Sequence, residues 1–166
     1  MSSRLFAAAR GLLYASGFVL LWWWVVDAAR PLDRRLAFSL PEWLWAPGLV
    51  LAACGAALAL CCVGTFALAG KGTPAPFDPP REFVAVGPYR YVRNPMYLGA
   101  VGVILGAGLT LRSPSALGVA VCFLALAHLL VVLYEEPSLE RRFGPSYLQY
   151  TASVRRWLPR LPGPER

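Results

Sequence analysis

The chain has 166 residues, of which 57% are hydrophobic and only 15% are charged, and its mean hydropathy is +0.52. A soluble domain carries about 25% charged residues, so this composition excludes an ordinary soluble domain and favours a single membrane domain. The net charge of +7 does not indicate nucleic acid as a partner, because the basic residues flank apolar segments, where they can contact lipid headgroups.

Four apolar segments are each long enough to cross a hydrocarbon core about 30 Å thick as a helix. They cover about residues 5–26, 47–69, 95–111 and 115–134. The first follows two arginines, as a signal peptide would, but it lacks a small-residue cleavage site, so we expect an uncleaved span. The last two are joined only by Arg112-Ser113-Pro114, which predicts an antiparallel helical hairpin. The sequence therefore predicts an all-α integral membrane bundle of about four transmembrane helices, with residues 1–166 in one domain.

The basic residues also predict an orientation. With four spans, the N-terminus, the loop 70–94 and the tail 135–166 share one side, which holds 12 of the 16 Lys and Arg residues. The positive-inside rule places that side in the cytoplasm. We therefore expect a multi-pass protein with both termini cytoplasmic, of the kind found in a bacterial inner membrane.

The loop and the tail differ in composition. The loop 70–94 contains five prolines, which predict an extended and fairly stiff chain rather than a helix. In the tail, apolar residues recur every three or four positions from residue 143 to residue 157. This spacing predicts an interfacial amphipathic helix at about residues 145–156, with Arg155 and Arg156 among the arginines that would snorkel to the headgroups.

Residues 87–97 carry three tyrosines, two arginines and two prolines, far more than a simple connection needs. Asn94 and Pro95 fit the N-cap and the first position of the third helix, and this structural role alone would explain both. The functional alternative is that the helix N-terminus binds an anion together with Arg93. Within that helix, four glycines predict close helix packing in preference to room for a ligand.

Glu135 and Glu136 are expected to end the fourth helix immediately before Pro137. Carboxylates at a helix C-terminus are unfavourably placed and raise each other's pKa, so they need a cation. Arg141 or Arg142 would provide one, and a bound ligand with an ammonium, a sulfonium or ribose hydroxyls is the alternative.

His128 precedes Glu135 by seven residues and so should lie on nearly the same helical face. It is either a hydrogen-bonded core histidine or a functional group. The four cysteines lie inside apolar runs and form no CxxC pair, which argues against a metal site.

Taken together, these features resemble the isoprenylcysteine carboxyl methyltransferase and phospholipid methyltransferase family of integral membrane enzymes. The resemblance covers about half of the chain, roughly residues 70–159. The matching elements are Gly87-Pro88-Tyr89-Arg90-Tyr91-Val92-Arg93-Asn94-Pro95-Met96-Tyr97-Leu98-Gly99, Glu135-Glu136-Pro137-Ser138-Leu139, Phe143-Gly144-Pro145-Ser146-Tyr147-Leu148-Gln149-Tyr150 and Arg155-Arg156-Trp157-Leu158-Pro159.

The resemblance implies a methyltransferase that uses S-adenosylmethionine, bound on the cytoplasmic side between the helical hairpin and the C-terminal segment. It makes Arg93 and Glu136 the candidate catalytic residues. Many relatives have histidine at the position of Asn94, and asparagine does not titrate near neutral pH, so we expect no general base there. The candidate cofactor-binding residues are Tyr89, Tyr91, Asn94, Pro95, Tyr97, His128, Glu135, Glu136 and Leu139.

These residue types suit the cofactor chemically. Tyrosine rings can face a sulfonium, an arginine can hold a carboxylate, and the glutamates can receive an ammonium or ribose hydroxyls. The expected partners are membrane lipids and a hydrophobic or lipid substrate, without nucleic acid or metal. Carboxylate, amine and thiol acceptors are all left open, and a non-catalytic four-span binding or scaffold subunit is the alternative function.

Overall fold

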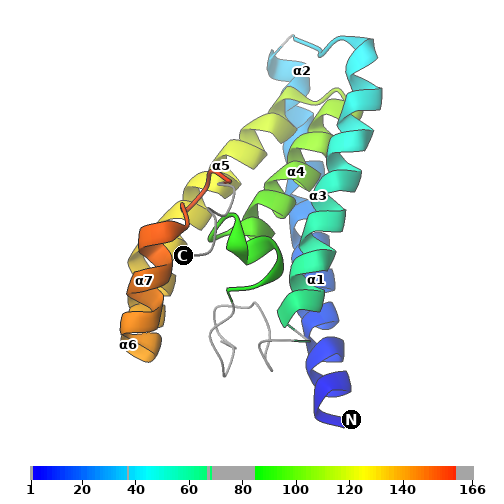
Figure 1. Ribbon diagram of the computed structural model, residues 1–166. Helices are drawn as coiled ribbons and strands as arrows, with labels where there is room; N and C mark the ends of the chain where they lie inside the picture. Colours follow the sequence, from blue (N-terminus) through cyan, green and yellow to red (C-terminus); the bar gives the residue numbers. More distant parts are fainter. Residues whose placement is uncertain (1, 37, 67, 69–84, 160–166) are drawn as a thin grey trace.

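The computed structural model describes residues 2–36, 38–66, 68 and 85–159, and within these ranges every regular element is helical. The prediction of an all-α chain is therefore confirmed for the described residues (Figure 1). In chain order the elements are α1 (Ser2–Ala29), η1 (Arg30–Leu32), α2 (Asp33–Leu36), η2 (Glu42–Leu44), α3 (Trp45–Thr65), η4 (Gly87–Arg90), α4 (Pro95–Thr110), α5 (Pro114–Leu130), η5 (Val131–Glu135), α6 (Glu136–Phe143) and α7 (Pro145–Ser153).

Two helices are long and apolar enough to cross a membrane, namely residues Glu42–Thr65 and the continuous helix Pro114–Phe143. The apolar helix α4 is shorter, at 16 residues. The expected segments 47–69, 95–111 and 115–134 thus coincide broadly with helices, as does the segment 5–26 with α1. Most of the proline-rich loop, residues 69–84, lies outside the described residues, and the part that is described contains the short 3-10 turn η4.

Helices α3 and α4 pack backbone to backbone through glycines. A Cβ atom added at Gly55 would lie 2.5 Å from the carbonyl oxygen of Gly99, and one added at Gly99 would lie 2.7 Å from the carbonyl oxygen of Gly55. The obstructing atoms belong to the helix backbones and cannot move aside as a side chain could. Only glycine therefore permits the two helices to approach this closely. The packing interpretation of the glycines in α4 is confirmed.

Aromatic side chains join α1 to α5. The rings of Trp22 and Phe123 meet edge to face with centroids 4.7 Å apart, and Phe18 contacts Phe123 at 5.6 Å. Trp23 and Trp24 point away from this core and are 61% and 66% exposed, as expected of side chains that face lipid. One side of α1 therefore packs on the bundle, and the other meets the surroundings.

The turn between α4 and α5 is held by its neighbours. Arg112 adopts a φ of 55°, which is unusual for a residue other than glycine, and its Nε donates to the carbonyl of Leu40 at 3.1 Å. Ser113 then caps α5 by accepting from the N–H of Ala116, and Asp33 accepts from the N–H of Ser115 at 2.8 Å. The predicted helical hairpin is confirmed.

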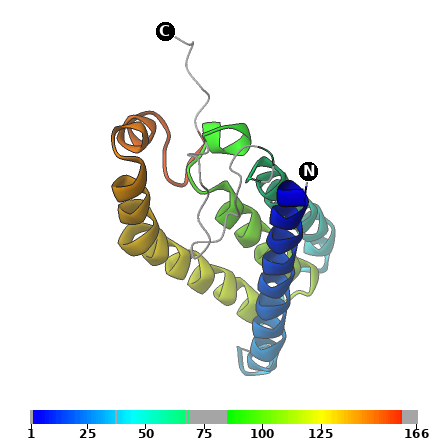
Figure 2. The same ribbon diagram turned by 90° about the horizontal axis from the view of Figure 1, so that it is seen from below.

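The sequence predicts that the fourth helix ends at Glu135 and Glu136, and this prediction is wrong. The helix continues through Pro137 to Phe143, with one wide π turn, η5, in its path. Proline is tolerated because it stands at the start of α6, where the wide turn has already broken the regular ladder of backbone hydrogen bonds. Seen from below, α5 and α6 curve away from the bundle of α1, α3 and α4 (Figure 2).

The predicted amphipathic helix at residues 145–156 is shorter than expected. Gly144, with a φ of 52°, reverses the chain, and α7 then ends at Ser153 because Val154 is extended. Residues 154–157, which we call the C-terminal strap, run back toward the start of α4 (Figure 1). Arg155 and Arg156 are therefore not helical residues snorkelling to headgroups.

Candidate functional site

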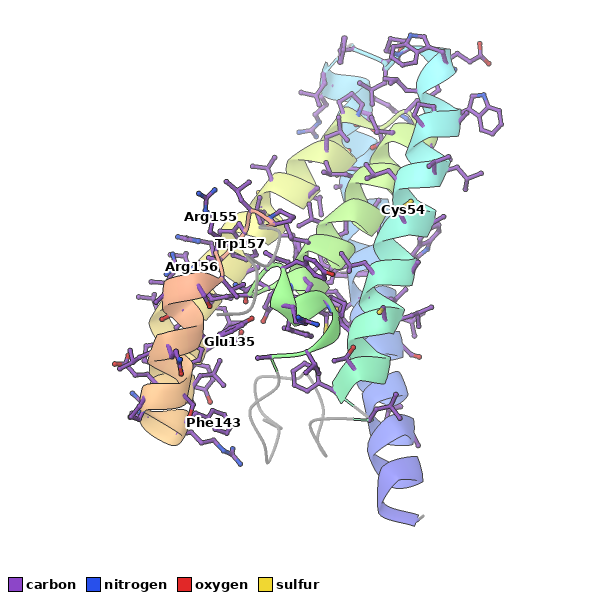
Figure 3. The ribbon with its side chains drawn as sticks, in the orientation of Figure 1. Cys54, Glu135, Phe143, Arg155, Arg156 and Trp157 are labelled. Atoms are coloured by element: carbon purple, nitrogen blue, oxygen red, sulfur yellow. The ribbon has the colours of Figure 1, made fainter. Side chains whose placement is uncertain are left out.

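Three segments that are distant in sequence meet at one place. They are the start of α4, the junction of η5 with α6, and the C-terminal strap (Figure 3). The apolar run of the fourth helix ends at Tyr134, so the two glutamates that follow lie just beyond the expected span. This meeting point is the candidate site.

Glu136 is held between two arginines. Its Oε1 and Oε2 atoms accept from Nε and Nη2 of Arg156, both at 2.8 Å, in a two-pronged arrangement. The Nη1 atom of Arg93 lies 3.1 Å from Oε1. All three side chains are half-buried or better, so the attraction is weakly screened. The expected cation partners, Arg141 and Arg142, are not the ones that Glu136 uses.

The strap is also tied to α4 through backbone atoms. The N–H of Arg93 donates to the carbonyl of Arg155 at 2.9 Å, and Nδ2 of Asn94 donates to the carbonyl of Arg156 at 3.1 Å. Asn94 does stand at the N-cap position, but its side chain makes no capping hydrogen bond. The capping interpretation is therefore wrong for the side chain, which is used instead to hold the strap.

This contact predicts the effect of Asn94→Asp. Aspartate caps a helix as well as asparagine does, so a capping role would leave stability unchanged. Because aspartate cannot donate to the Arg156 carbonyl, we expect a loss of about 1–3 kcal/mol in the free energy of unfolding. Thermal unfolding of both proteins in the same detergent measures it, and equal stability would contradict the contact.

Glu135 has a different neighbour. Its Oε1 accepts a hydrogen bond from the hydroxyl of Tyr97 on α4. The side chain is partly buried, and the charge of Glu136 is adjacent. Burial raises the pKa of Glu135, as does Glu136, and the bond from Tyr97 only partly offsets both.

The pKa values of Glu135 and Glu136 are therefore shifted in opposite directions. Burial alone would raise the pKa of Glu136, but the hydrogen bonds from Arg156 and the charges of Arg93 and Arg156 outweigh it, and the net shift is downward. Glu136 is a fixed anion at neutral pH, whereas Glu135 is the carboxyl that is easier to protonate. Tyr147 beside them has its pKa raised to about 12, chiefly by burial and then by Glu136, so its phenol stays neutral.

Replacing Glu135 by glutamine should therefore not destabilise the protein. A raised pKa in the folded state means that stability falls as pH rises above the ordinary value of 4.5. Glutamine removes this cost and still accepts from Tyr97, so we expect a melting temperature at or above wild type at about pH 7.5. Melting curves across the pH range measure it, and a lower melting temperature for Glu135→Gln at neutral pH would contradict the assignment.

Trp157 joins His128 to the site. The indole Nε1–H donates to Nδ1 of His128 at 3.0 Å, and the ring of Trp157 meets that of Tyr97 edge to face at 6.5 Å. His128 is therefore a hydrogen-bonded histidine near the end of α5 that anchors the tip of the strap.

The remaining candidate residues are Tyr89, Tyr91, Pro95 and Leu139, and they differ in what they contact and in how exposed they are. Tyr89 packs against Phe66, which follows the last residue of α3, with ring centroids 5.1 Å apart, and the carbonyl of Tyr89 accepts from the hydroxyl of Tyr150 at 2.7 Å. Pro95 is fully buried at the start of α4, Leu139 is partly buried on α6, and Tyr91 is 43% exposed. The structure thus groups Arg93, Asn94, Tyr97, His128, Glu135 and Glu136, while Tyr89 belongs to the α3 core.

Arg156, Trp157 and Tyr147 were not predicted as site residues. The pattern that places Tyr147 on an apolar stripe is correct, but it also placed Arg156 on the polar side of a helix that ends earlier. A usable signal was present, because Arg155-Arg156-Trp157 combines two cations with an aromatic residue, as residues 87–97 do.

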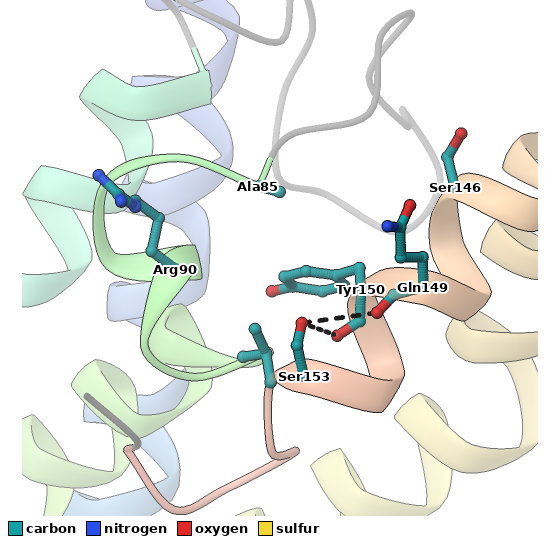
Figure 4. A pocket seen from close by; sticks show the side chains of 7 residues that line it. Ala85, Arg90, Ser146, Gln149, Tyr150 and Ser153 are labelled. Carbon is teal, nitrogen blue, oxygen red and sulfur yellow. Dashed lines mark hydrogen bonds between the residues drawn. The ribbon is translucent and has the colours of Figure 1, made fainter. Parts of the chain in front are cut away.

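A hollow of about 360 Å³ lies between η4 and α7 (Figure 4), and none of the cluster residues lines it. It is shallow and open to its surroundings, and its lining is of mixed polarity. Its lining consists of Ala85, Arg90, Ser146, Gln149, Tyr150, Ser153 and Val154.

Comparison with known protein families matches the chain to the model described as phospholipid methyltransferase, over residues 43–146. This stretch is well over half of the 166 residues and includes η4, α4, α5 and both glutamates. The chain belongs to the phospholipid methyltransferase family. Comparisons with curated proteins and with solved structures gave no match.

Membership of the phospholipid methyltransferase family confirms the resemblance drawn from the motifs and indicates methyltransferase activity. Together with the two apolar helices, it also indicates a membrane location. The matched stretch ends at Ser146, so the C-terminal strap lies beyond it. Among the residues described, no group of three His, Cys, Asp or Glu side chains could hold a metal ion.

Proposed function

We propose that the protein transfers a methyl group from S-adenosylmethionine to a membrane-embedded or hydrophobic acceptor, a carboxylate, an amine or a thiol, at the cytoplasmic face. The observation that carries this proposal is the cluster of Arg93, Glu135 and Glu136, which brings both signs of charge together at the start of α4. Family membership supports the reaction type.

The residues present fit this cofactor. The Nε atom of Arg93 is buried and has no hydrogen-bond partner within the described part of the chain, so it is available to a carboxylate. Glu135 has one oxygen bonded to Tyr97, and its carboxylate suits an ammonium or a ribose hydroxyl. Both oxygens of Glu136 are engaged by arginines, so we assign it to fixing Arg93 rather than to direct contact with the cofactor.

The cofactor would supply a methyl group that is already activated on a sulfonium. The task of the protein is then to orient the acceptor, hold the charged ends in place and exclude water. Arg93 would bind a carboxylate, and the aromatic rings of Tyr97 and Trp157 would shield the site. No strong base is required for a carboxylate, a thiolate or a free amine.

The direct test is calorimetric titration of the purified protein with S-adenosylhomocysteine, in detergent and in lipid nanodiscs. We expect saturable binding with a stoichiometry of one. No binding in any of these environments would refute the proposal. Incubation of membrane extracts with isotopically labelled cofactor, followed by mass spectrometry, would identify the acceptor. Binding without any methylated product would instead favour the non-catalytic subunit.

The four-span topology with both termini and the loop 70–94 in the cytoplasm also belongs to this proposal, as does a bacterial inner membrane as the location. It is supported by the excess of basic residues on that side. We expect a cysteine introduced as Ala75→Cys to react with an impermeant maleimide only after the cell is opened. Labelling of intact cells would reverse the orientation.

A further inference from the structure

Glu136 depends on a residue from the far end of the described chain. Arg156 supplies two of the three short contacts to its carboxylate, through Nε and Nη2, each at 2.8 Å. The third contact comes from Nη1 of Arg93 at 3.1 Å. A planar guanidinium that binds both oxygens fixes the plane of the carboxylate as well as its position. The direction in which Glu136 faces Arg93 is therefore set by Arg156.

The strap presents Arg156 in one orientation because it is anchored on both sides. The carbonyl of Arg155 accepts from the N–H of Arg93, and the carbonyl of Arg156 accepts from Asn94. Trp157 then bonds to His128 of α5. The strap thus bridges α4 and the fourth helix, two elements that diverge from their common turn (Figure 1).

We propose that Arg156 is a positioning residue, which acts through Glu136 to aim Arg93 at the ligand. The proposal rests on the proposed function, since it assumes that Arg93 contacts the cofactor or the acceptor. Arg156 has no other carboxylate partner among the described residues. Its guanidinium also contributes to the lowered pKa of Glu136.

The test compares Arg156→Lys and Arg156→Ala with wild type. Lysine keeps the charge but cannot bind both oxygens in one plane. We expect the affinity for S-adenosylhomocysteine to fall about 10- to 100-fold in Arg156→Ala and less in Arg156→Lys. Arg141→Ala is the matched control, because it removes the same charge from an exposed position on α6. Arg141→Ala should bind S-adenosylhomocysteine with wild-type affinity.

A second measurement separates positioning from mere stability and needs no ligand. The carboxyl carbon of Glu136, followed by NMR against pH, should titrate at higher pH in Arg156→Ala and unchanged in Arg141→Ala. Wild-type affinity of the folded Arg156→Lys protein, or an unmoved Glu136 titration in Arg156→Ala, would overturn the proposal. If wild-type protein failed to bind S-adenosylhomocysteine, the proposed function would fall, whereas the NMR result would still decide whether Arg156 positions Glu136.

Discussion

Replacing Glu136 by glutamine is expected to cost about 3 kcal/mol or more of stability and most of the affinity for S-adenosylhomocysteine. The side chain is only 18% exposed, and its charge faces Arg93 and Arg156. Glutamine would leave the two guanidinium groups close together without an anion and would turn an amide N–H₂ toward one of them. Thermal unfolding and calorimetry on the same preparation would measure both losses.

Glu140→Gln is the matched control for this variant. Glu140 lies one turn further along α6 and is exposed, so its replacement should leave both quantities near wild type. Lowering the pH should reproduce part of the loss of stability seen in Glu136→Gln. Because the pKa of Glu136 is lowered, its contribution is fully present above its ordinary value of 4.5 and is lost as pH falls through the folded-state pKa. A Glu136→Gln protein as stable as Glu140→Gln would contradict the ion-pair cluster.

Replacing Gly106 by alanine is expected to give the second large loss. The added Cβ would lie 2.6 Å from the carbonyl oxygen of Gly48 and even closer to the backbone nitrogen of Ala52. Since both obstacles are backbone atoms of α3, the two helices must separate. Overpacking typically costs about 1–3 kcal/mol, and we expect the upper end or beyond. The melting temperature and the yield of monodisperse protein are the measurements.

Two other glycines make this prediction a graded series. A Cβ at Gly102 would lie 3.2 Å from Cα of Gly55, a contact that a small shift relieves, so Gly102→Ala should cost less. Gly118 on α5 has nothing within 4 Å, and Gly118→Ala should be neutral or stabilise by up to about 1 kcal/mol. If Gly106→Ala and Gly118→Ala behaved alike, the close packing of α3 on α4 would be refuted.

Periodicity and length predicted most of the helices, and the reason is physical. Apolar runs bounded by prolines and turn residues can satisfy their backbone hydrogen bonds in lipid only as helices. The hairpin at Arg112, the packing glycines and the start of α4 at Pro95 all followed from local chemistry. These features depend on neighbours within a few residues or on one repeated spacing.

The parts that were mispredicted depend on contacts between distant segments. The local pattern ends the fourth helix at Glu135 and Glu136, immediately before Pro137, whereas the helix continues through the wide turn η5 into α6. The local pattern assigns the Asn94 side chain to helix capping, whereas it donates to the carbonyl of Arg156, 62 residues away. Local rules assign such a side chain to the nearest backbone group, whereas the fold gives it to the strap.

The position of the strap has a consequence for the order of assembly. The strap contacts the start of α4 and the fourth helix at once, so it can dock only after these helices have come together. Before it docks, Glu136 has only Arg93 opposite it, and the bridge between α4 and the fourth helix does not exist. Completion of the charged cluster therefore follows the packing of the helices. A chain that stopped at Ser153 would keep its apolar helices but would lack the means to close its own site.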